Sequence, residues 1–353
     1  MFVTNSQDVL AERPRAQSAS RKTGRISPFL SSQLHVLSPR TVTHSIGRPR
    51  MQVDLRTEVA GLELRNPTML SAGILGMTAK SLRTVWDAGA GAVVTKSLGL
   101  KPREGYPNPS VVDVGCGLLN AMGLPNPGVH EFLKELKVAR SGNPIKIIGS
   151  VYGGSSEEFA EAAKILSQGG VDAVELNVSC PHVREVGVEI GQNPELVEEV
   201  VSEVKKAVTL PLFVKLSPNV TSITNLALAA ERGGADALVA INTLRAMAID
   251  IETHRPVLGN RIGGLSGPAI KPVALRCVYE VSQAVRIPVV GCGGIADWRD
   301  AVEFLLAGAS AVQIGTAIAY RDLSIFKEVA SGLERYLLRR GHRRVGEIVG
   351  LSH

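Results

Sequence analysis

The sequence has few cysteines and few aromatic residues. Four cysteines are spread over 353 residues without a C-x-x-C pair, and aromatic side chains make up only 4% of the chain. Scattered cysteines argue against a disulfide framework and against a zinc site, so we expect no metal and a reducing compartment. The low aromatic content argues against a nucleic-acid platform built on stacked rings.

Long apolar runs are also missing, and the charge imbalance is confined to one end. No apolar stretch reaches the length that spans a bilayer, so we expect a soluble, cytoplasmic protein without a membrane segment. Residues 1–50 carry eight Lys and Arg against Asp8 and Glu12, which accounts for the whole net charge of +6. The remaining sequence is electrically balanced, which argues against a body that binds DNA or RNA.

Residues 1–50 differ from the rest in other ways. They are rich in Ser and Arg, poor in acidic residues and without hydrophobic periodicity, as in a mitochondrial transit peptide. Sequence translated from a start codon placed too early would look the same. Met51 directly precedes alternating apolar residues that predict a hairpin around Ala60 and Gly61. We therefore expect residues 1–50 to be a disordered extension or a mis-assigned start, and residues 51–353 to be one domain.

After this hairpin, eight short apolar runs alternate with helical patterns. In "SSEEFAEAAKILSQGG", for example, Ser155 or Ser156 is expected to cap a helix that ends at Gly169 and Gly170. The alternation predicts an α/β fold, a (β/α)8 TIM barrel. An open doubly wound sheet is the alternative, but the G-x-G-x-x-G expected after its first strand is not found there. The eight runs are residues 67–73, 92–97, 145–151, 173–178, 212–217, 237–243, 288–294 and 311–316.

Two connections are longer than a helix requires, at residues 97–145 and 243–268. The second contains "AIDIETHRPVLG", which predicts an exposed hairpin rather than a metal site. Both connections follow predicted strand C-termini, so we expect them to build the active-site face of the barrel.

Polar residues and glycines stand where the predicted strands end. Buried inside the barrel, the polar side chains would be unpaired, so we expect them to face its mouth. Glycines after the seventh and eighth strands allow backbone N–H groups to cradle a phosphate, and FMN fits such a site. Lys215 would then stabilise the reduced ring, although a single lysine is more often an ordinary surface residue. The residues at these ends are Lys96, Ser150, Asn177, Lys215, Asn242, Thr243, Gly293, Gly294, Gly315 and Thr316.

Several long motifs are similar to those of class 1 dihydroorotate dehydrogenases. They are "SLGLKPREGYPNP", "GLLNAMGLPNPG", "ELNVSCP", "FVKLSPNVT", "INT", "GGLSGPAIKPVALR", "VVGCGGI" and "GASAVQIGTA". The resemblance extends from about Val53 to about Leu338, and residues 1–50 have no counterpart in it.

The resemblance implies an FMN-containing barrel that oxidises (S)-dihydroorotate to orotate in de novo pyrimidine (UMP) biosynthesis. Cys180 resembles the base that removes the C5 proton while hydride passes from C6 to the flavin. The implied flavin-binding residues are Ala72, Lys96, Ser97, Ser150, Asn177, Lys215, Ile241, Gly267, Gly293, Gly294, Gly315 and Thr316. The implied substrate-binding residues are Lys96, Asn120, Ala121, Met122, Gly123, Leu124, Asn177, Asn242 and Thr243.

Within this class, "GGLSGPAIKPVALR" and "NVSCP" resemble the heterotetrameric type 1B. That type implies a homodimer of this chain with partner subunits that carry FAD and a 2Fe–2S cluster and pass electrons to NAD+. This chain has no cysteine cluster for such a centre, and Cys116, Cys277 and Cys292 are expected to be structural. Two positions depart from the family pattern, because His182 and Ser150 stand where asparagines are expected.

Two other functions fit parts of the sequence. One is another FMN barrel acting on a pyrimidine ring, such as a dihydropyrimidine dehydrogenase domain or a dihydrouridine synthase. The balanced charge counts against the second of these, which acts on tRNA. The other is a non-redox phosphate-binding barrel, which would leave Cys180 and Lys215 without a role.

Overall fold

The computed structural model describes residues 52–179 and 190–353. Residues 1–50, Cys180 and His182 lie outside the described residues, so the expectations for them stay predictions. Residues Arg50–His353 form one compact unit, and all elements below belong to it.

Eight parallel strands form a closed barrel, in the order β10-β15-β16-β3-β4-β7-β8-β9. Each of the eight predicted runs contains or overlaps one of these strands, which confirms the (β/α)8 fold and excludes the doubly wound sheet. The strands are β3 (Thr68–Leu70), β4 (Ala92–Val94), β7 (Ile147–Val151), β8 (Ala173–Asn177), β9 (Leu212–Leu216), β10 (Ala237–Ala240), β15 (Val289–Cys292) and β16 (Ala309–Ile314).

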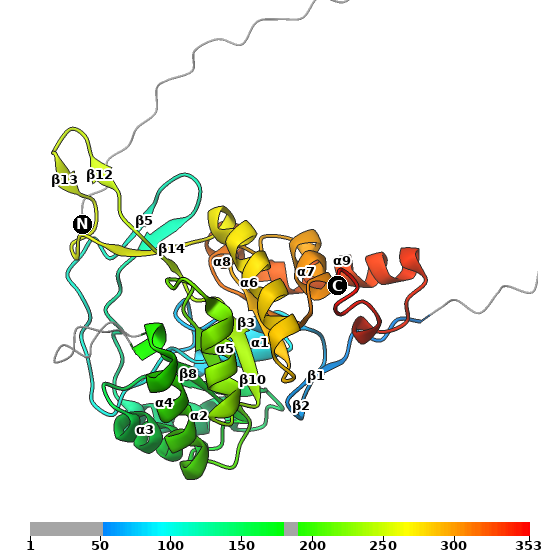
Figure 1. Cartoon of the computed structure of the whole chain (residues 1–353), viewed down its shortest axis with the longest axis horizontal. Coiled ribbons are helices and arrows are strands. Elements are labelled where there is room, and N and C mark those ends of the chain that lie inside the picture. Colours follow the sequence, from blue (N-terminus) through cyan, green and yellow to red (C-terminus); the bar gives the residue numbers. More distant parts are fainter. Residues whose placement is uncertain (1–51, 180–189) are drawn as a thin grey trace, which may run out of the picture. The chain divides into compact units, whose positions relative to one another are not determined.

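Amphipathic helices surround the barrel (Figure 1). In α3 the side chain of Ser155 caps the helix by accepting from Glu158 N, and Phe159 and Leu166 are buried. None of the helices in the described part of the chain is long and apolar enough to cross a membrane. The helices are α1 (Ala79–Asp87), α2 (Val129–Arg140), α3 (Ser156–Gln168), α4 (Pro194–Ala207), α5 (Ile223–Arg232), α6 (Lys271–Ala284), α7 (Trp298–Leu306), α8 (Ala317–Arg321) and α9 (Ile325–Arg340), with 3-10 turns at Ile190–Gln192, Pro268–Ile270, Asp322–Ser324 and Val345–Glu347.

The predicted N-terminal hairpin closes one end of the barrel. Its strands, β1 (Thr57–Val59) and β2 (Leu62–Leu64), pair antiparallel around Ala60 and Gly61. Val59 and Leu64 form one buried cluster with barrel-interior side chains such as Phe213. The hairpin therefore supplies the apolar floor, and the opposite end is left for the site.

The two long connections come together at the C-terminal ends of the barrel strands. They contribute a four-stranded antiparallel sheet in the order β11-β14-β6-β5, and the predicted hairpin pairs β12 with β13. This hairpin extends away from the barrel beside β5 and β14 (upper left in Figure 1). The strands are β5 (Val111–Asp113), β6 (Leu118–Asn120), β11 (Leu244–Ala246), β12 (Ile249–Asp250), β13 (Arg255–Pro256) and β14 (Gly263–Ser266).

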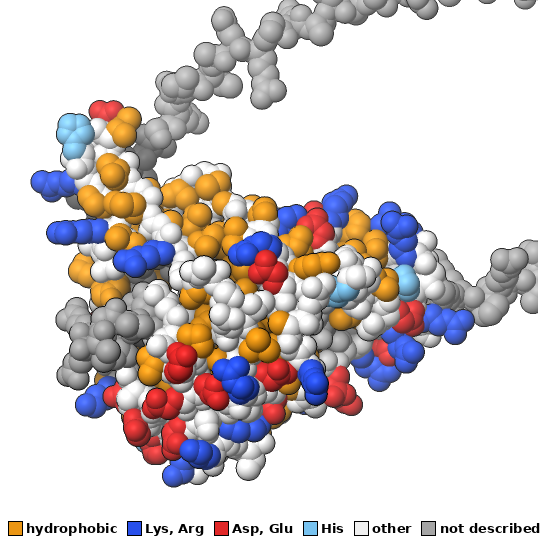
Figure 2. Space-filling view, viewed as in Figure 1, with side chains coloured by type: hydrophobic (Ala, Val, Ile, Leu, Met, Phe, Trp, Pro, Cys, Tyr) orange, Lys and Arg blue, Asp and Glu red, His pale blue; other side chains and the backbone are white. Residues whose placement is uncertain are grey.

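Apolar side chains gather at this projecting end, where Lys and Arg side chains stand among them, whereas acidic and basic side chains are mixed over the lower part of the view (Figure 2). Met247, Ile249, Ile251 and Ile262 are all exposed there. An exposed apolar surface of this kind is typical of a protein–protein contact.

Candidate active site

A cavity of about 500 Å³ opens where the barrel strands end, beside the four-stranded sheet. It brings together most of the residues singled out from the sequence. Those in its lining are Ala72, Lys96, Ser97, Asn120, Met122, Leu124, Asn177, Lys215, Ile241, Asn242, Thr243, Gly267, Gly293, Gly294, Gly315 and Thr316. Ser150, Ala121 and Gly123 are not part of the lining.

A row of hydrogen bonds joins three polar side chains of the cavity wall. Asn242 Nδ2 donates to Asn177 Oδ1 at 3.2 Å, and Asn177 Nδ2 donates to Ser97 Oγ at 3.1 Å. Ser97 Oγ lies 2.9 Å from the hydroxyl of Ser150, which is fully buried behind it. Ser150 therefore orients Ser97 rather than facing the cavity.

The segment after β6 forms another part of the wall. Asn120 Nδ2 donates to the carbonyl of Gly264 at 3.0 Å, which fastens β6 to β14. Ala121 is buried in a small apolar cluster of the sheet. A Cβ on Gly123 would lie 2.6 Å from Tyr106 N, so this position has no room for a side chain. Ala121 and Gly123 therefore shape the segment from outside the cavity.

Glycines make a close-packed cradle in the loops after β14 and β15. Gly267, Gly293 and Gly294 all have positive φ, which side chains other than glycine rarely adopt. A Cβ on Gly294 would lie 2.7 Å from Lys271 N, and one on Gly293 would lie 2.8 Å from Ala274 Cβ. The loop after β15 therefore packs directly against α6, with no room for a side chain at either position.

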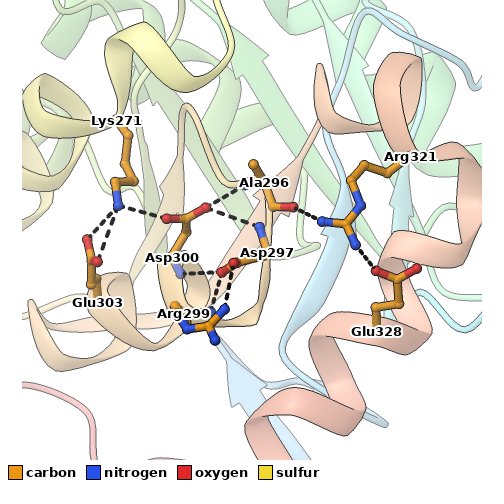
Figure 3. Close-up of polar contacts among 8 residues, drawn as sticks. All are labelled: Lys271, Ala296, Asp297, Arg299, Asp300, Glu303, Arg321 and Glu328. Atoms are coloured by element: carbon orange, nitrogen blue, oxygen red, sulfur yellow. Dashed lines mark hydrogen bonds and ion pairs between the residues drawn. The ribbon is translucent and has the colours of Figure 1, made fainter. Parts of the chain in front are cut away.

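Polar contacts at the start of α7 hold the loop after β15 in place (Figure 3). Asp300 accepts from the backbone N–H groups of Ala296 at 2.8 Å and Asp297 at 3.1 Å. Lys271 Nζ lies 2.7 Å from Asp300 Oδ1, and this hydrogen bond raises the pKa of Lys271.

Arg321 ties the same loop to the segment after β16. Its guanidinium donates to the carbonyl of Ala296 at 3.3 Å and pairs with Glu328 of α9 (Figure 3). The two loops that follow the seventh and eighth barrel strands are thus joined by contacts of the protein itself.

Lys215 lies deeper in the barrel than expected. It is only 4% exposed, and its Nζ donates to Gln313 Oε1 at 2.8 Å and to Ser71 Oγ at 3.1 Å. Burial alone would lower the pKa of Lys215, but the charges of Cys292 and Glu175 outweigh burial, so its pKa is raised. The assumption that polar side chains inside the barrel would be unpaired was wrong for Lys215 and for Ser150.

Lys96 is the other lysine of the cavity, at its outer part. It is half-buried, and burial lowers its pKa because the ammonium loses hydration.

Several cavity residues were not found from the sequence. Ser71, Gln313 and Cys292 all line the cavity, and Cys292 Sγ lies 3.6 Å from Ser71 Oγ. Glu175 lies fully buried behind them. A charged residue in the middle of the buried run "AVELNV" was the available signal for Glu175.

Among residues 52–179 and 190–353 there is no cluster of three His, Cys, Asp or Glu side chains that could hold a metal ion. The described cavity offers lysine ammonium groups, asparagine amides and glycine backbone N–H groups for recognition of a ligand.

Known proteins resemble almost the whole of this unit. A family model described as dihydroorotate dehydrogenase matches residues 54–337. A Methanosarcina acetivorans protein is 54% identical over 296 residues, covering 84% of this chain and 95% of the relative. A Methanothermobacter thermautotrophicus protein is 53% identical, covering 85% and 98%, respectively. A Pyrococcus abyssi protein is 51% identical, covering 84% and 99%. All three relatives are named dihydroorotate dehydrogenase B (NAD(+)), catalytic subunit.

Proposed function

The chain belongs to the dihydroorotate dehydrogenase family, and from that premise we propose that it is the catalytic subunit of a type 1B enzyme. It oxidises (S)-dihydroorotate to orotate in pyrimidine biosynthesis, with NAD+ as the final electron acceptor. The observation that carries this proposal is the cavity that joins Lys96, Asn177, Lys215 and Asn242, in a chain more than half identical to such subunits.

We infer that the cavity holds FMN. The residues present fit this group: the glycine cradle suits a phosphate, and the buried ammonium of Lys215 suits the N1/O2 edge of a flavin ring. When bound, FMN supplies the ring that accepts hydride. The chain contributes a fixed position for that ring and a positive charge where reduction places negative charge.

Dihydroorotate carries a carboxylate and a ring of alternating C=O and N–H groups. Lys96 is the cation placed to pair with the carboxylate. Asn120, Asn177 and Asn242 each offer a donor and an acceptor, and the hydrogen bonds among them and their neighbours hold the amides in fixed directions. This arrangement orients the ring before the reaction.

Cys180 is proposed as the base that takes the C5 proton. It stands three residues after Asn177, which lies at the end of β8. His182 follows two residues later, where the family pattern has an asparagine. The role of Cys180 rests on the match to "ELNVSCP".

We propose a partner subunit with FAD and a 2Fe–2S cluster, a homodimer of this chain within that assembly, and a cytoplasmic location. Cys116, Cys277 and Cys292 are far apart in the sequence, and among the described residues they form no cluster for iron. The exposed apolar end of the molecule offers a surface for such contacts.

The test uses the purified full-length chain. We expect a yellow protein whose flavin is bleached by dihydroorotate without oxygen. Cys180→Ala should keep the flavin and lose nearly all bleaching, whereas Cys277→Ala, in a buried cysteine outside the cavity, should bleach normally. A colourless protein contradicts the FMN proposal. A flavoprotein that dihydroorotate does not bleach favours another pyrimidine-ring substrate.

The electron acceptor needs a separate experiment. NAD+ reduction is measured for the chain alone and after addition of a candidate iron–sulfur subunit. We expect reduction only in the presence of the partner. Equal activity in both samples, or none in either, counts against the type 1B assembly.

A further inference from the structure

A buried row of polar side chains crosses the barrel interior below the cavity. Lys215 on β9 donates to Gln313 Oε1 on β16 at 2.8 Å, and Gln313 Nε2 donates to Glu175 Oε2 on β8 at 2.6 Å. Glu175 is 0%, Gln313 1% and Lys215 4% exposed. In the barrel order, β16 lies opposite β8, so the row spans the barrel. Glu175 has no role in the proposed function so far.

The chemistry of the two ends determines how the amide between them points. An ammonium only donates hydrogen bonds, and a carboxylate only accepts them. Gln313 therefore satisfies both ends in one orientation, with its oxygen toward Lys215 and its NH2 toward Glu175. Within the described residues Glu175 Oε1 has no hydrogen-bond partner, so the bond to Gln313 is the contact through which Glu175 acts.

Lys215 needs a nearby anion, because burial without a partner favours the neutral amine. The titratable groups acting on it are Glu175 on β8 and the thiol of Cys292 on β15. Ser71, directly after β3, and Gln313 on β16 bond to it as uncharged groups. Of the two titratable groups Glu175 is the carboxylate, and two hydrogen bonds through Gln313 connect it to the Lys215 ammonium.

Lys96, just after β4, lines the same cavity and is a cation, so it cannot take the place of this anion. Its pKa is lowered by burial, and a second positive charge in the cavity would oppose the charging of Lys215. The Glu175 carboxylate therefore provides the negative charge that favours the ammonium form of Lys215.

We propose that Glu175 is a positioning residue that acts through Gln313 to keep Lys215 charged and directed at the flavin, and so raises the reduction potential of the bound cofactor. The proposal rests on the proposed FMN site. It adds a link across the barrel between a carboxylate that does not line the cavity and the ring that accepts hydride.

The direction in which the flavin midpoint potential changes when the Glu175 charge is removed separates an effect through Lys215 from a direct charge effect on the flavin. A carboxylate acting only through space disfavours the reduced, more negative flavin, so its removal would raise the potential. A carboxylate acting through Lys215 has the opposite effect, because without it the ammonium is lost. Glu175→Gln keeps the size of the side chain and removes the charge.

The experiment measures the midpoint potential of the bound flavin in the full-length chain at about pH 7, where a buried lysine without an anion is expected to be neutral. We expect Glu175→Gln to disfavour reduction about tenfold, which is ~30 mV more negative for a two-electron couple. Lys215→Met should shift the potential in the same direction. The exchange variant Glu175→Gln with Gln313→Glu places a carboxylate directly against Lys215 and should restore the wild-type value.

Asp172→Asn is the matched control. Asp172 directly precedes β8 and pairs with Arg140 and Lys146, none of which lines the cavity. This change should lower stability without moving the potential. If Glu175→Gln does not fold, Gln313→Met tests the same link, because it cuts the bridge and leaves the carboxylate in place; a more negative potential is again expected.

An unchanged or more positive potential in the Glu175 variant, or in Gln313→Met where that variant replaces it, overturns the proposal. The proposal is also overturned if the midpoint potential of the exchange variant stays as negative as that of Glu175→Gln. Failure of the proposed function looks different, because the wild-type chain would then bind no flavin or would not be reduced by dihydroorotate.

Discussion

Gly294→Ala tests how tightly the glycine cradle packs against α6. Gly294 has φ +77°, and an added Cβ would lie 2.7 Å from Lys271 N and 2.8 Å from Lys271 Cα. These are backbone atoms of α6, so a change of rotamer cannot relieve the contact. Either the loop after β15 moves or α6 does.

The magnitude has two parts. A residue other than glycine in the left-handed region costs roughly 1–2 kcal/mol. Overpacking against a fixed neighbour adds about 1–3 kcal/mol. If the loop relaxes by moving into the cavity, the second part appears as weaker flavin binding, at about tenfold per 1.4 kcal/mol.

Gly61→Ala is the control, because it separates backbone strain from steric contact. Gly61 has nearly the same φ, +79°, but nothing lies within 4 Å of an added Cβ, and it is in the β1–β2 turn away from the cavity. Gly61→Ala should lose only the stability that the backbone strain costs, and it should bind FMN as the wild type does.

The assays are urea unfolding and the dissociation constant for FMN measured by flavin fluorescence. We expect Gly294→Ala to lose more stability than Gly61→Ala, or to bind FMN at least several-fold more weakly, or both. Equal stability losses with unchanged FMN affinity would refute the packing argument for the cradle.

Three further predictions concern other parts of the site and the core. Lys96→Met should raise the KM for dihydroorotate more than about tenfold, the scale of 1.4 kcal/mol, with flavin retained, because it removes the cation for the carboxylate; an unchanged KM in steady-state kinetics contradicts this role. Burial lowers the pKa of Lys96 below 10.5, so the ammonium loses its proton before that pH is reached and the wild-type KM should rise. Over the same pH window the unfolded chain binds more protons than the folded chain, so the free energy of unfolding should increase with pH. Lys96→Met should show neither trend. Phe213→Ala, in the fully buried barrel interior, should lose about 3–5 kcal/mol of unfolding free energy in urea, whereas Val138→Ala, at a 55% exposed position, should change little.

Local patterns in the sequence were sufficient to predict the hairpin, the helix cap and the barrel strands. The hairpin at Ala60 and Gly61, the N-cap at Ser155 and the eight apolar runs follow from turn chemistry, capping and periodicity, and the structure has all of them. Such signals act over a few residues, so they do not depend on what the chain meets elsewhere.

The part of the candidate site that could be predicted consists of residues at the ends of the barrel strands. Strand ends placed Lys96, Asn177, Asn242 and the glycines together, because parallel strands of a barrel end on one face. Ala121 and Gly123 match the family pattern and Ser150 stands at a flavin position of that pattern, yet all three stay out of the cavity lining. A motif does not say on which side of its backbone a residue packs.

The sequence by itself determined the barrel, its closing hairpin and the residue types at its mouth, since periodicity and turn residues are local properties. Only the tertiary structure decided that the two long connections share one sheet, and that Lys215, Gln313 and Glu175 meet inside the barrel. Gln313 is 98 residues from Lys215 and 138 residues from Glu175 in the sequence. Closure of the barrel brings them within hydrogen-bond distance, and no local pattern encodes that meeting.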